Sequence, residues 1–354
     1  MKPQKEQGGG PPARWQESGG RKRALPVAAL ACLTLALTLA GCADRYSGVS
    51  AAPAPPRSDF PSAGGQTLAD LYTASDGESG LVILPTELVF DKGRDRYGFG
   101  VYTPGNEQVS DAKAALYFAH GPNGKAIGPF PARIESLATQ PAFIAETTGK
   151  DSKAAKVVYV ADGVPLQADG EWRVLAMVKK GDSTEATFVP SAVVGHSPHP
   201  QPGFPKSPSN PPDVGEAAPR IHPPPPADVG DELRKIDTRI PPDDMHEDLA
   251  EALGKEPVVL LFATPQFCQS RVCGPVVDEA EQVKQTDGEG VAFIHMEIYK
   301  GNNPKAGVRP QVSAYRLPSE PWLFVIDRSG IIRTRIEGAW GIPELERAIE
   351  EVKR

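Results

Sequence analysis

The stretch from Pro257 to Val277, PVVLLFATPQFCQSRVCGPVV, decides the fold of the carboxy-terminal part of this 354-residue chain. It begins with a continuous apolar run over residues 257–263, which is typical of a strand that is buried on both faces. Cys268 and Cys273 follow this run. Proline is favoured in the first turn of a helix, so Pro275 and the apolar residues at helical spacing after it indicate a helix. The stretch therefore predicts a strand, a loop that carries cysteine, and a helix.

Strand and helix patterns also alternate on both sides of this stretch. Residues 248–253 predict a short helix before it, and residues 291–299, 322–327 and 331–336 predict further strands after it. A last helix is predicted to begin at Pro343, because apolar residues then follow the spacing i, i+3, i+4, i+7: Leu345, Ala348, Ile349 and Val352. This order of elements predicts an α/β domain over residues 230–354.

Three features of this domain resemble thioredoxin-like proteins. Residues 273–275 (CGP) follow the first core strand and open a helix, as Cys-Gly-Pro-Cys does in thioredoxin. Residues 320–322 (EPW) precede a strand where the family has a cis-proline that faces the cysteines. Residues 324–330 (FVIDRSG) resemble the strand and turn of the cytochrome-biogenesis and peroxiredoxin-like branches. The resemblance implies a thioredoxin-like fold for about a third of the chain.

The cysteine spacing departs from the family pattern. The family pair is C-x-x-C, whereas four residues separate Cys268 from Cys273, and Val276 stands where the second family cysteine would be. Within one regular helix five residues rise about 7.5 Å, beyond the limit of roughly 7 Å between the Cα atoms of a disulfide. Because Pro275 belongs in the first helical turn, residues 268–272 are predicted to be a loop, and this loop can close a Cys268–Cys273 disulfide.

The resemblance implies thiol–disulfide exchange with a protein disulfide or dithiol, and it implies no soluble cofactor. Free N–H groups at a helix amino terminus favour a thiolate, which indicates Cys273 as the attacking sulfur and Cys268 as its partner. The reverse assignment stays open, because the first family cysteine is usually the nucleophile. Pro321, if cis, would shape the backbone that docks a substrate strand against the sulfurs.

Other functions stay open at this point. The domain could be a non-enzymatic surface module with a structural disulfide, as is common in oxidising compartments. A peroxiredoxin-like peroxidase would need a threonine three residues before its attacking cysteine, and Pro265 stands there. A copper-assembly factor would add a histidine to two cysteines, and the position of His295 does not match. We therefore expect no metal site.

Several polar residues near this domain receive no catalytic role. His295 and Glu297 share one face of a predicted strand, since side chains alternate along it. Met245-His246 precedes the domain and is expected at the surface. Asp278 and Glu279 are expected to be solvated acids in the helix after the cysteines.

Residues 67–195 predict a separate all-β domain. Short runs of alternating or β-branched residues, separated by turn residues, favour a sandwich: they cover 96–103, 112–119, 156–161, 171–178 and 184–194. Residues 169–174 (DGEWRV) resemble a late strand of Ig-like domains in extracytoplasmic bacterial proteins. Trp172 is expected in the core and His120 in a solvated loop, so this domain carries no catalytic set.

A proline-rich segment, residues 196–229, is predicted to link the two domains. Proline-rich sequence favours extended polyproline II geometry and acts as a semi-rigid spacer. His196, His199 and His222 lie in this segment without cysteine or acidic ligands at suitable spacing, so they are interpreted as linker residues rather than as a metal site.

Residues 1–41 resemble a bacterial lipoprotein signal. A polar segment ending in Arg21-Lys22-Arg23 precedes an uncharged run over 24–40, and Leu39-Ala40-Gly41-Cys42 matches a lipobox. The resemblance implies that Cys42 is acylated and anchors the protein to the extracytoplasmic side of a bacterial cell membrane. The alternative is an uncleaved transmembrane helix, for which the run is short. Residues 42–66 are predicted to be a flexible tether.

The charge of the chain argues against nucleic acid as a partner. The full chain has a net charge of −7, and residues 1–41 contribute an excess of four positive charges, so the rest carries −11. Binding phosphates requires clustered lysine and arginine. The four cysteines also exclude a disulfide-dense scaffold.

Overall fold

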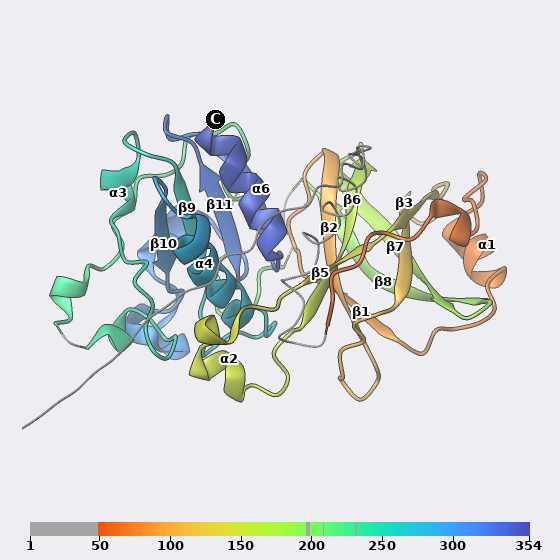
Figure 1. Ribbon diagram of the computed structural model, residues 1–354. Coiled ribbons are helices and arrows are strands. Elements are labelled where there is room, and N and C mark those ends of the chain that lie inside the picture. The colour runs from red at the N-terminus through yellow and green to blue at the C-terminus, as the bar shows by residue number, and fades with distance from the viewer. Residues whose placement is uncertain (1–48, 196–198, 208, 231) are drawn as a thin grey trace, which may run out of the picture. The chain divides into compact units, whose positions relative to one another are not determined.

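A computed structural model describes residues 49–195, 199–207, 209–230 and 232–354. The predicted signal over 1–41, the predicted lipidation of Cys42 and His196 lie outside these residues. Within them, no helix has the length and apolar character needed to cross a membrane. The described residues form three four-stranded sheets and a few helices, with the strand orders β1-β2-β6-β5, β4-β3-β7-β8 and β10-β9-β11-β12 (Figure 1).

The first two sheets belong to residues 49–195, called the first region below. Every strand pair within these two sheets is antiparallel. Side chains from both sheets fill one apolar cluster that includes Phe99, Phe118 and Trp172. The burial of Trp172 and the exposure of His120 are as predicted. The elements are α1 (Leu68–Thr73), β1 (Val82–Pro85), β2 (Gly93–Tyr102), β3 (Lys113–His120), β4 (Ile127–Pro131), β5 (Arg133–Ser136), α2 (Glu146–Lys150), β6 (Val157–Leu166), β7 (Gly170–Lys180) and β8 (Ser183–Val194).

The third sheet belongs to residues 199–354, called the second region below. Strands β9 and β10 are parallel, and β11 runs antiparallel to both β9 and β12. The strands and the cysteine-bearing helix lie where the sequence predicts them, and the last helix begins within a residue of Pro343. The elements are α3 (Leu249–Ala252), β9 (Val258–Phe262), α4 (Cys273–Asp287), β10 (Ala292–Met296), α5 (Pro310–Ala314), β11 (Trp322–Ile326), β12 (Ile332–Glu337) and α6 (Ile342–Lys353).

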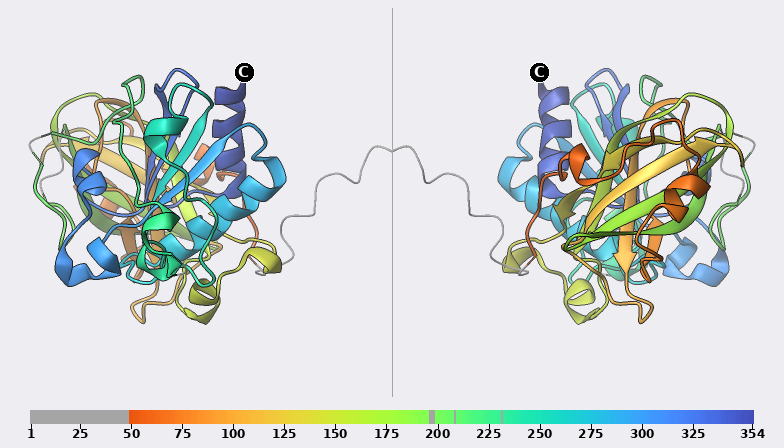
Figure 2. Two further views of the ribbon diagram at one scale, coloured as in Figure 1. Left: turned by 90° about the vertical axis from the view of Figure 1, so that its left-hand side faces the viewer. Right: turned by 90° about the vertical axis from the view of Figure 1, so that its right-hand side faces the viewer.

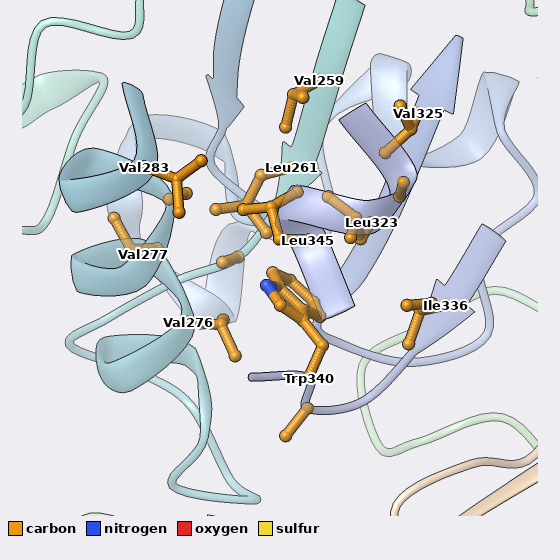
Figure 3. Close-up of a cluster of buried hydrophobic side chains, with 14 of the residues drawn as sticks. Val259, Leu261, Val276, Val277, Val283, Leu323, Val325, Ile336, Trp340 and Leu345 are labelled. Carbon is orange, nitrogen blue, oxygen red and sulfur yellow. The ribbon is translucent and has the colours of Figure 1, made fainter. Parts of the chain in front are cut away.

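Two helices, α4 and α6, cover one face of the third sheet (Figures 1 and 2). Figure 3 shows apolar side chains packed between this helical layer and the sheet. The indole of Trp340 lies between Val276 of α4 and Leu323 of β11. Val158 and Val160 of β6 belong to the same buried cluster, so the helical layer also contacts the first region. The residue where the family has its second cysteine, Val276, is therefore part of the core.

The proline-rich segment packs against the opposite face of the third sheet instead of standing free as a spacer. Phe204, Ala218 and Ile221 are buried in the apolar cluster on that face. Ala217 pairs with Ile331 beside β12 in an antiparallel bridge. Proline prevents a helix here, but the apolar residues between the prolines have a sheet face to cover, so the segment contributes to the core.

The described part of the predicted tether also packs onto the protein. Ala52 pairs with Ile134 of β5 through two backbone hydrogen bonds of 2.9 and 2.8 Å. Phe60 and Ala63 are buried in a cluster with α1. The prediction of a flexible tether over 42–66 is therefore wrong for residues 49–66, because these apolar side chains find buried partners.

The two regions belong to one compact unit and are joined by buried ion pairs. The guanidinium of Arg96 on β2 donates to Glu87, at 2.7 Å, and to Glu344 of α6, at 2.9 Å. Glu337 of β12 accepts from the backbone N–H groups of Leu88 and Val89, both at 2.9 Å. These contacts fix the second region, and with it the helix that begins at Cys273, against the first.

Candidate functional site

Cys268 and Cys273 are joined in a disulfide. Their Cα atoms are 5.9 Å apart, within the range that a disulfide requires. Residues 268–272 are not helical, and Arg271 has a positive φ of 61°, which turns the chain back toward Cys268. The predicted loop and the predicted disulfide are both confirmed.

The amino terminus of α4 points at the sulfur of Cys268. The backbone N–H of Cys273, the first residue of α4, donates to Cys268 Sγ at 3.2 Å. Cys273 is fully buried, whereas Cys268 is partly exposed. The exposure of Cys268 and the helix N–H group that contacts its sulfur therefore favour Cys268 as the attacking sulfur. The sequence indicates Cys273 for this role and leaves the reverse assignment open.

The loop of the disulfide is held by residues far away in the sequence. Thr238 Oγ1 accepts from the backbone N–H of Gln266 at 3.1 Å. The backbone oxygen of Arg271 accepts from Ala155 of the first region at 3.0 Å. A pocket of about 220 Å³ is lined by Cys268 and by residues of both regions, including Thr147, Asp151, Pro265 and Gly274.

Glu320 is the group that sequence reasoning missed. Its carboxylate and the sulfurs of Cys268 and Cys273 all lie within 4.8 Å of one another. The residue is 1% exposed, and neither carboxylate oxygen has a hydrogen bond of good geometry. Burial raises the pKa of Glu320 to about 8, close to that of an ordinary thiol. The position of Glu320 directly before Pro321, at the start of a predicted strand, could have indicated that this residue lies near the cysteines.

Pro321 has the cis peptide bond that the family resemblance implies. The proline is buried, and the backbone N–H of Glu320 before it donates to Gln201 Oε1 at 3.2 Å. Gln201 lies in the proline-rich segment, so this peptide group already has a partner within the chain. The exposed approach to the disulfide is instead the pocket beside Cys268.

The prediction that Asp278 and Glu279 are solvated is wrong, because α4 lies between the third sheet and the first region. Asp278 accepts from Arg239 Nε at 3.0 Å and from the backbone N–H of Ala145 at 3.1 Å. Glu279 is fully buried without a hydrogen-bond partner, and burial raises its pKa well above the usual range.

Met245 is also buried and His246 is largely buried, contrary to the prediction of a surface position. Met245 is 1% exposed, and the side chain of His246 is 10% exposed. Their segment runs beside β10, where the N–H of His295 donates to the oxygen of Met245 at 2.7 Å and His246 pairs with Ile294. Because this segment pairs with β10, these two residues lie in the interior.

His295 and Glu297 are both buried and face polar partners. His295 Nδ1 lies 2.7 Å from Asp243 Oδ2, and Glu297 Oε1 accepts from the backbone N–H of Thr238 at 2.7 Å. Burial raises the pKa of Glu297, and the negative charge of Glu297 adds to the rise at Glu320. His295 lies with Asp243 and not with the cysteines.

Comparison with known proteins adds no assignment to this geometry. No protein-family model matches the chain, and no curated protein matches it.

Proposed function

We propose that this protein is an extracytoplasmic, lipid-anchored bacterial protein whose second region is a thioredoxin-like domain that performs thiol–disulfide exchange. The observation that carries the proposal is a partly exposed disulfide at the start of α4 with a buried carboxyl group beside both sulfurs. The proposed substrate is a protein disulfide or dithiol, and the proposed anchor is the lipid on Cys42. The first region is proposed to be an Ig-like sandwich that spaces or docks the domain.

The order of elements supports a thioredoxin-like domain. Strand β9, helix α4 and the parallel strand β10 form a βαβ unit, and the antiparallel strands β11 and β12 with α6 complete the sheet. The cysteines stand at the start of the helix of that unit, and the cis-proline leads into β11. The spacing of four residues between the cysteines is compatible with a disulfide, because the loop before α4 is not helical.

In the reducing direction, the thiolate of Cys268 attacks a substrate disulfide. A mixed disulfide forms, and one substrate sulfur leaves as a thiolate. Cys273 then passes its proton to the carboxylate of Glu320 and attacks Cys268 Sγ. This closes the Cys268–Cys273 disulfide and expels the second substrate sulfur, which takes up a proton. The substrate gains two electrons and the cysteine pair loses two; an external dithiol restores the reduced pair.

Glu320 suits the proton transfer because its pKa of about 8 lies close to that of a thiol. A proton then moves between the carboxyl group and Cys273 without a large cost in either direction, which is the condition for general acid–base catalysis near neutral pH. An ionised Glu320 also disfavours a neighbouring thiolate. Above pH 8, where Glu320 is ionised, this destabilises the reduced pair and makes it a stronger reductant.

The second candidate function is a non-enzymatic surface module with a structural disulfide. The burial of Cys273 and the hydrogen bond that the backbone N–H of Glu320 donates to Gln201 favour it. The exposure of Cys268 at a pocket, with an acid beside it, favours exchange.

Trapping experiments with the full chain separate the two functions. The reduced wild-type protein is expected to reduce insulin, and Cys273→Ser is expected to accumulate a mixed disulfide with a disulfide substrate through Cys268. The matched variant Cys268→Ser is expected to trap nothing and to lose insulin reduction. Measurement of the reduction potential of the pair completes the test. A disulfide that resists dithiothreitol in the folded protein would overturn the proposal, and trapping by Cys268→Ser alone would reverse the roles.

A further inference from the structure

A second buried cluster lies between the segment before α3 and β10. The side chains of Asp237, Asp243 and His246 each offer a ligand atom, and these atoms lie within 4.8 Å of one another. His246 Nε2 is 3.6 Å from Asp237 Oδ2 and 3.8 Å from Asp243 Oδ1. The side chains of both aspartates are 0% exposed, and that of His246 is 10% exposed.

The imidazole of His246 is aimed at the two carboxylates without bonding to either. Nε2 is buried and has no hydrogen-bond partner, and its contacts with the aspartates are too long for a hydrogen bond. A buried polar nitrogen without a partner costs free energy. The separations of 3.6 and 3.8 Å are close to those of ligands around a common ion: ligand atoms about 2.0–2.2 Å from a tetrahedral ion lie roughly 3.3–3.6 Å from one another.

Backbone groups hold the carboxylates in place. Asp237 Oδ2 accepts from the N–H of Asp243 at 2.6 Å, and Asp243 Oδ1 accepts from the N–H of Met245 at 2.9 Å. Each of these oxygens keeps a second lone pair, because a carboxylate oxygen accepts more than one bond. Such outer hydrogen bonds fix the ligands in metal sites.

A neighbouring histidine, His295, contacts one of the two carboxylates. The two ring nitrogens of His295 face Asp243 Oδ2, at 2.7 Å, and the backbone oxygen of Ala263, at 3.2 Å. The nearby guanidinium of Arg239 is engaged by Asp278. Buried charges are normally paired or bound to a metal.

We propose that Asp237, Asp243 and His246 bind one first-row divalent cation, with Zn²⁺ as the best fit. Carboxylate oxygen and imidazole nitrogen are both ligands that Zn²⁺ accepts, and a water molecule completes a tetrahedral set. The site lies apart from the cysteines and does not depend on their chemistry. Its occupancy would also steady Thr238, which holds the disulfide loop through Gln266.

Metal binding by the full, tag-free chain tests the proposal, with the disulfide intact so that thiolates do not compete. Equilibrium dialysis against Zn²⁺ with metal analysis is expected to give one ion per chain, and Zn²⁺ is expected to raise Tm. His246→Ala is expected to weaken binding by about 100-fold or more. The control His222→Ala removes an exposed histidine that faces Asp248, and it is expected to bind as the wild type does.

A second measurement covers the case in which a variant misfolds. Co²⁺ added to the wild-type protein is expected to give the visible absorption of a tetrahedral oxygen and nitrogen site, and Zn²⁺ is expected to abolish it. Absence of one bound Zn²⁺ in the folded wild-type chain overturns the proposal, as does undiminished binding by folded His246→Ala.

Discussion

The two regions of the molecule treat buried charge differently. In the first region the buried acids are Glu87 and Glu135, and each has an arginine partner, Arg96 and Arg133. In the second region Asp278 also has an arginine partner, Arg239, but other buried acids stand beside different groups: Glu320 beside two sulfurs, and Asp237 and Asp243 beside His246. Burying an acid costs free energy unless it is paired. The difference supports the proposal that the chemistry of the protein lies in the second region.

The largest expected effects of a substitution on stability come from truncating a buried aromatic side chain in the core of each region. Phe118 in the first region and Trp340 in the second are both fully buried, and truncating such an aromatic side chain to alanine costs about 3–5 kcal/mol. We expect Phe118→Ala and Trp340→Ala to lower the free energy of unfolding in urea by similar amounts. Only Trp340→Ala, which removes packing against α4, is expected to change the rate at which dithiothreitol reduces the folded protein. An equal change of the reduction rate in both variants would contradict the expected difference between the two regions.

The next effect is at the junction of the regions. Arg96→Ala removes the cation that Glu87 and Glu344 share. Glu344 keeps Arg133, but Glu87 is left buried without a cation, and breaking a buried pair in this way costs about 3 kcal/mol. Arg333→Ala is the matched control, because Arg333 pairs with Asp327 while half exposed and its loss is expected to cost about 1 kcal/mol or less. Urea unfolding measures both. A control as damaging as Arg96→Ala would mean that the junction contributes no more than a surface pair.

The pH dependence of stability is expected to follow the buried acids of the second region. Burial raises the pKa of Glu320 to about 8 and that of Glu337 to about 7, from about 4.5 in the unfolded chain. The folded state therefore binds more protons than the unfolded chain between about pH 4.5 and pH 8, and the two shifts together lower stability by roughly 6 kcal/mol as pH rises from 5 to 8. Thermal unfolding across this range should show the decline, and Glu320→Gln should remove about half of it, since Glu337 still contributes. A stability that rises toward pH 8 would contradict these shifts.

The smallest expected effect is kinetic and isolates Glu320. Below pH 8 the carboxyl group is protonated and can give its proton to the departing sulfur of Cys273; above pH 8 it is ionised and repels an incoming thiolate. The rate of disulfide reduction, corrected for the thiolate content of the reductant, is therefore expected to fall about tenfold above pH 8. Glu320→Gln should remove this inflection. The folded control Glu346→Gln, on the outer face of α6, should keep it.

Local patterns predicted much of the secondary structure. The continuous apolar run gave β9, and Pro275 correctly placed the start of α4 and the loop before it. Strands β1, β4 and β5 were missed, because they are short and two of them include proline, which weakens any strand pattern. Helix α5 was missed for a similar reason, since five residues show too little periodicity.

The candidate site was predicted only in part. Cys268, Cys273 and Pro321 could be chosen from the sequence because their order along the chain resembles a known motif. The burial of Asp278 could not, because it depends on Arg239 and on the backbone of Ala145, which lies 133 residues away. Polar residues were assigned to the surface by default, and that rule fails wherever distant backbone groups satisfy them.

The sequence by itself determined the disulfide, because the spacing of two cysteines and the proline after them are local properties of the chain. Only the tertiary structure decided that Glu320 lies beside the sulfurs and that Asp237, Asp243 and His246 converge. The environment of a buried carboxyl group is formed by strands and segments that are distant in the sequence. This environment sets the pKa of the group and its ability to bind a proton or a metal ion.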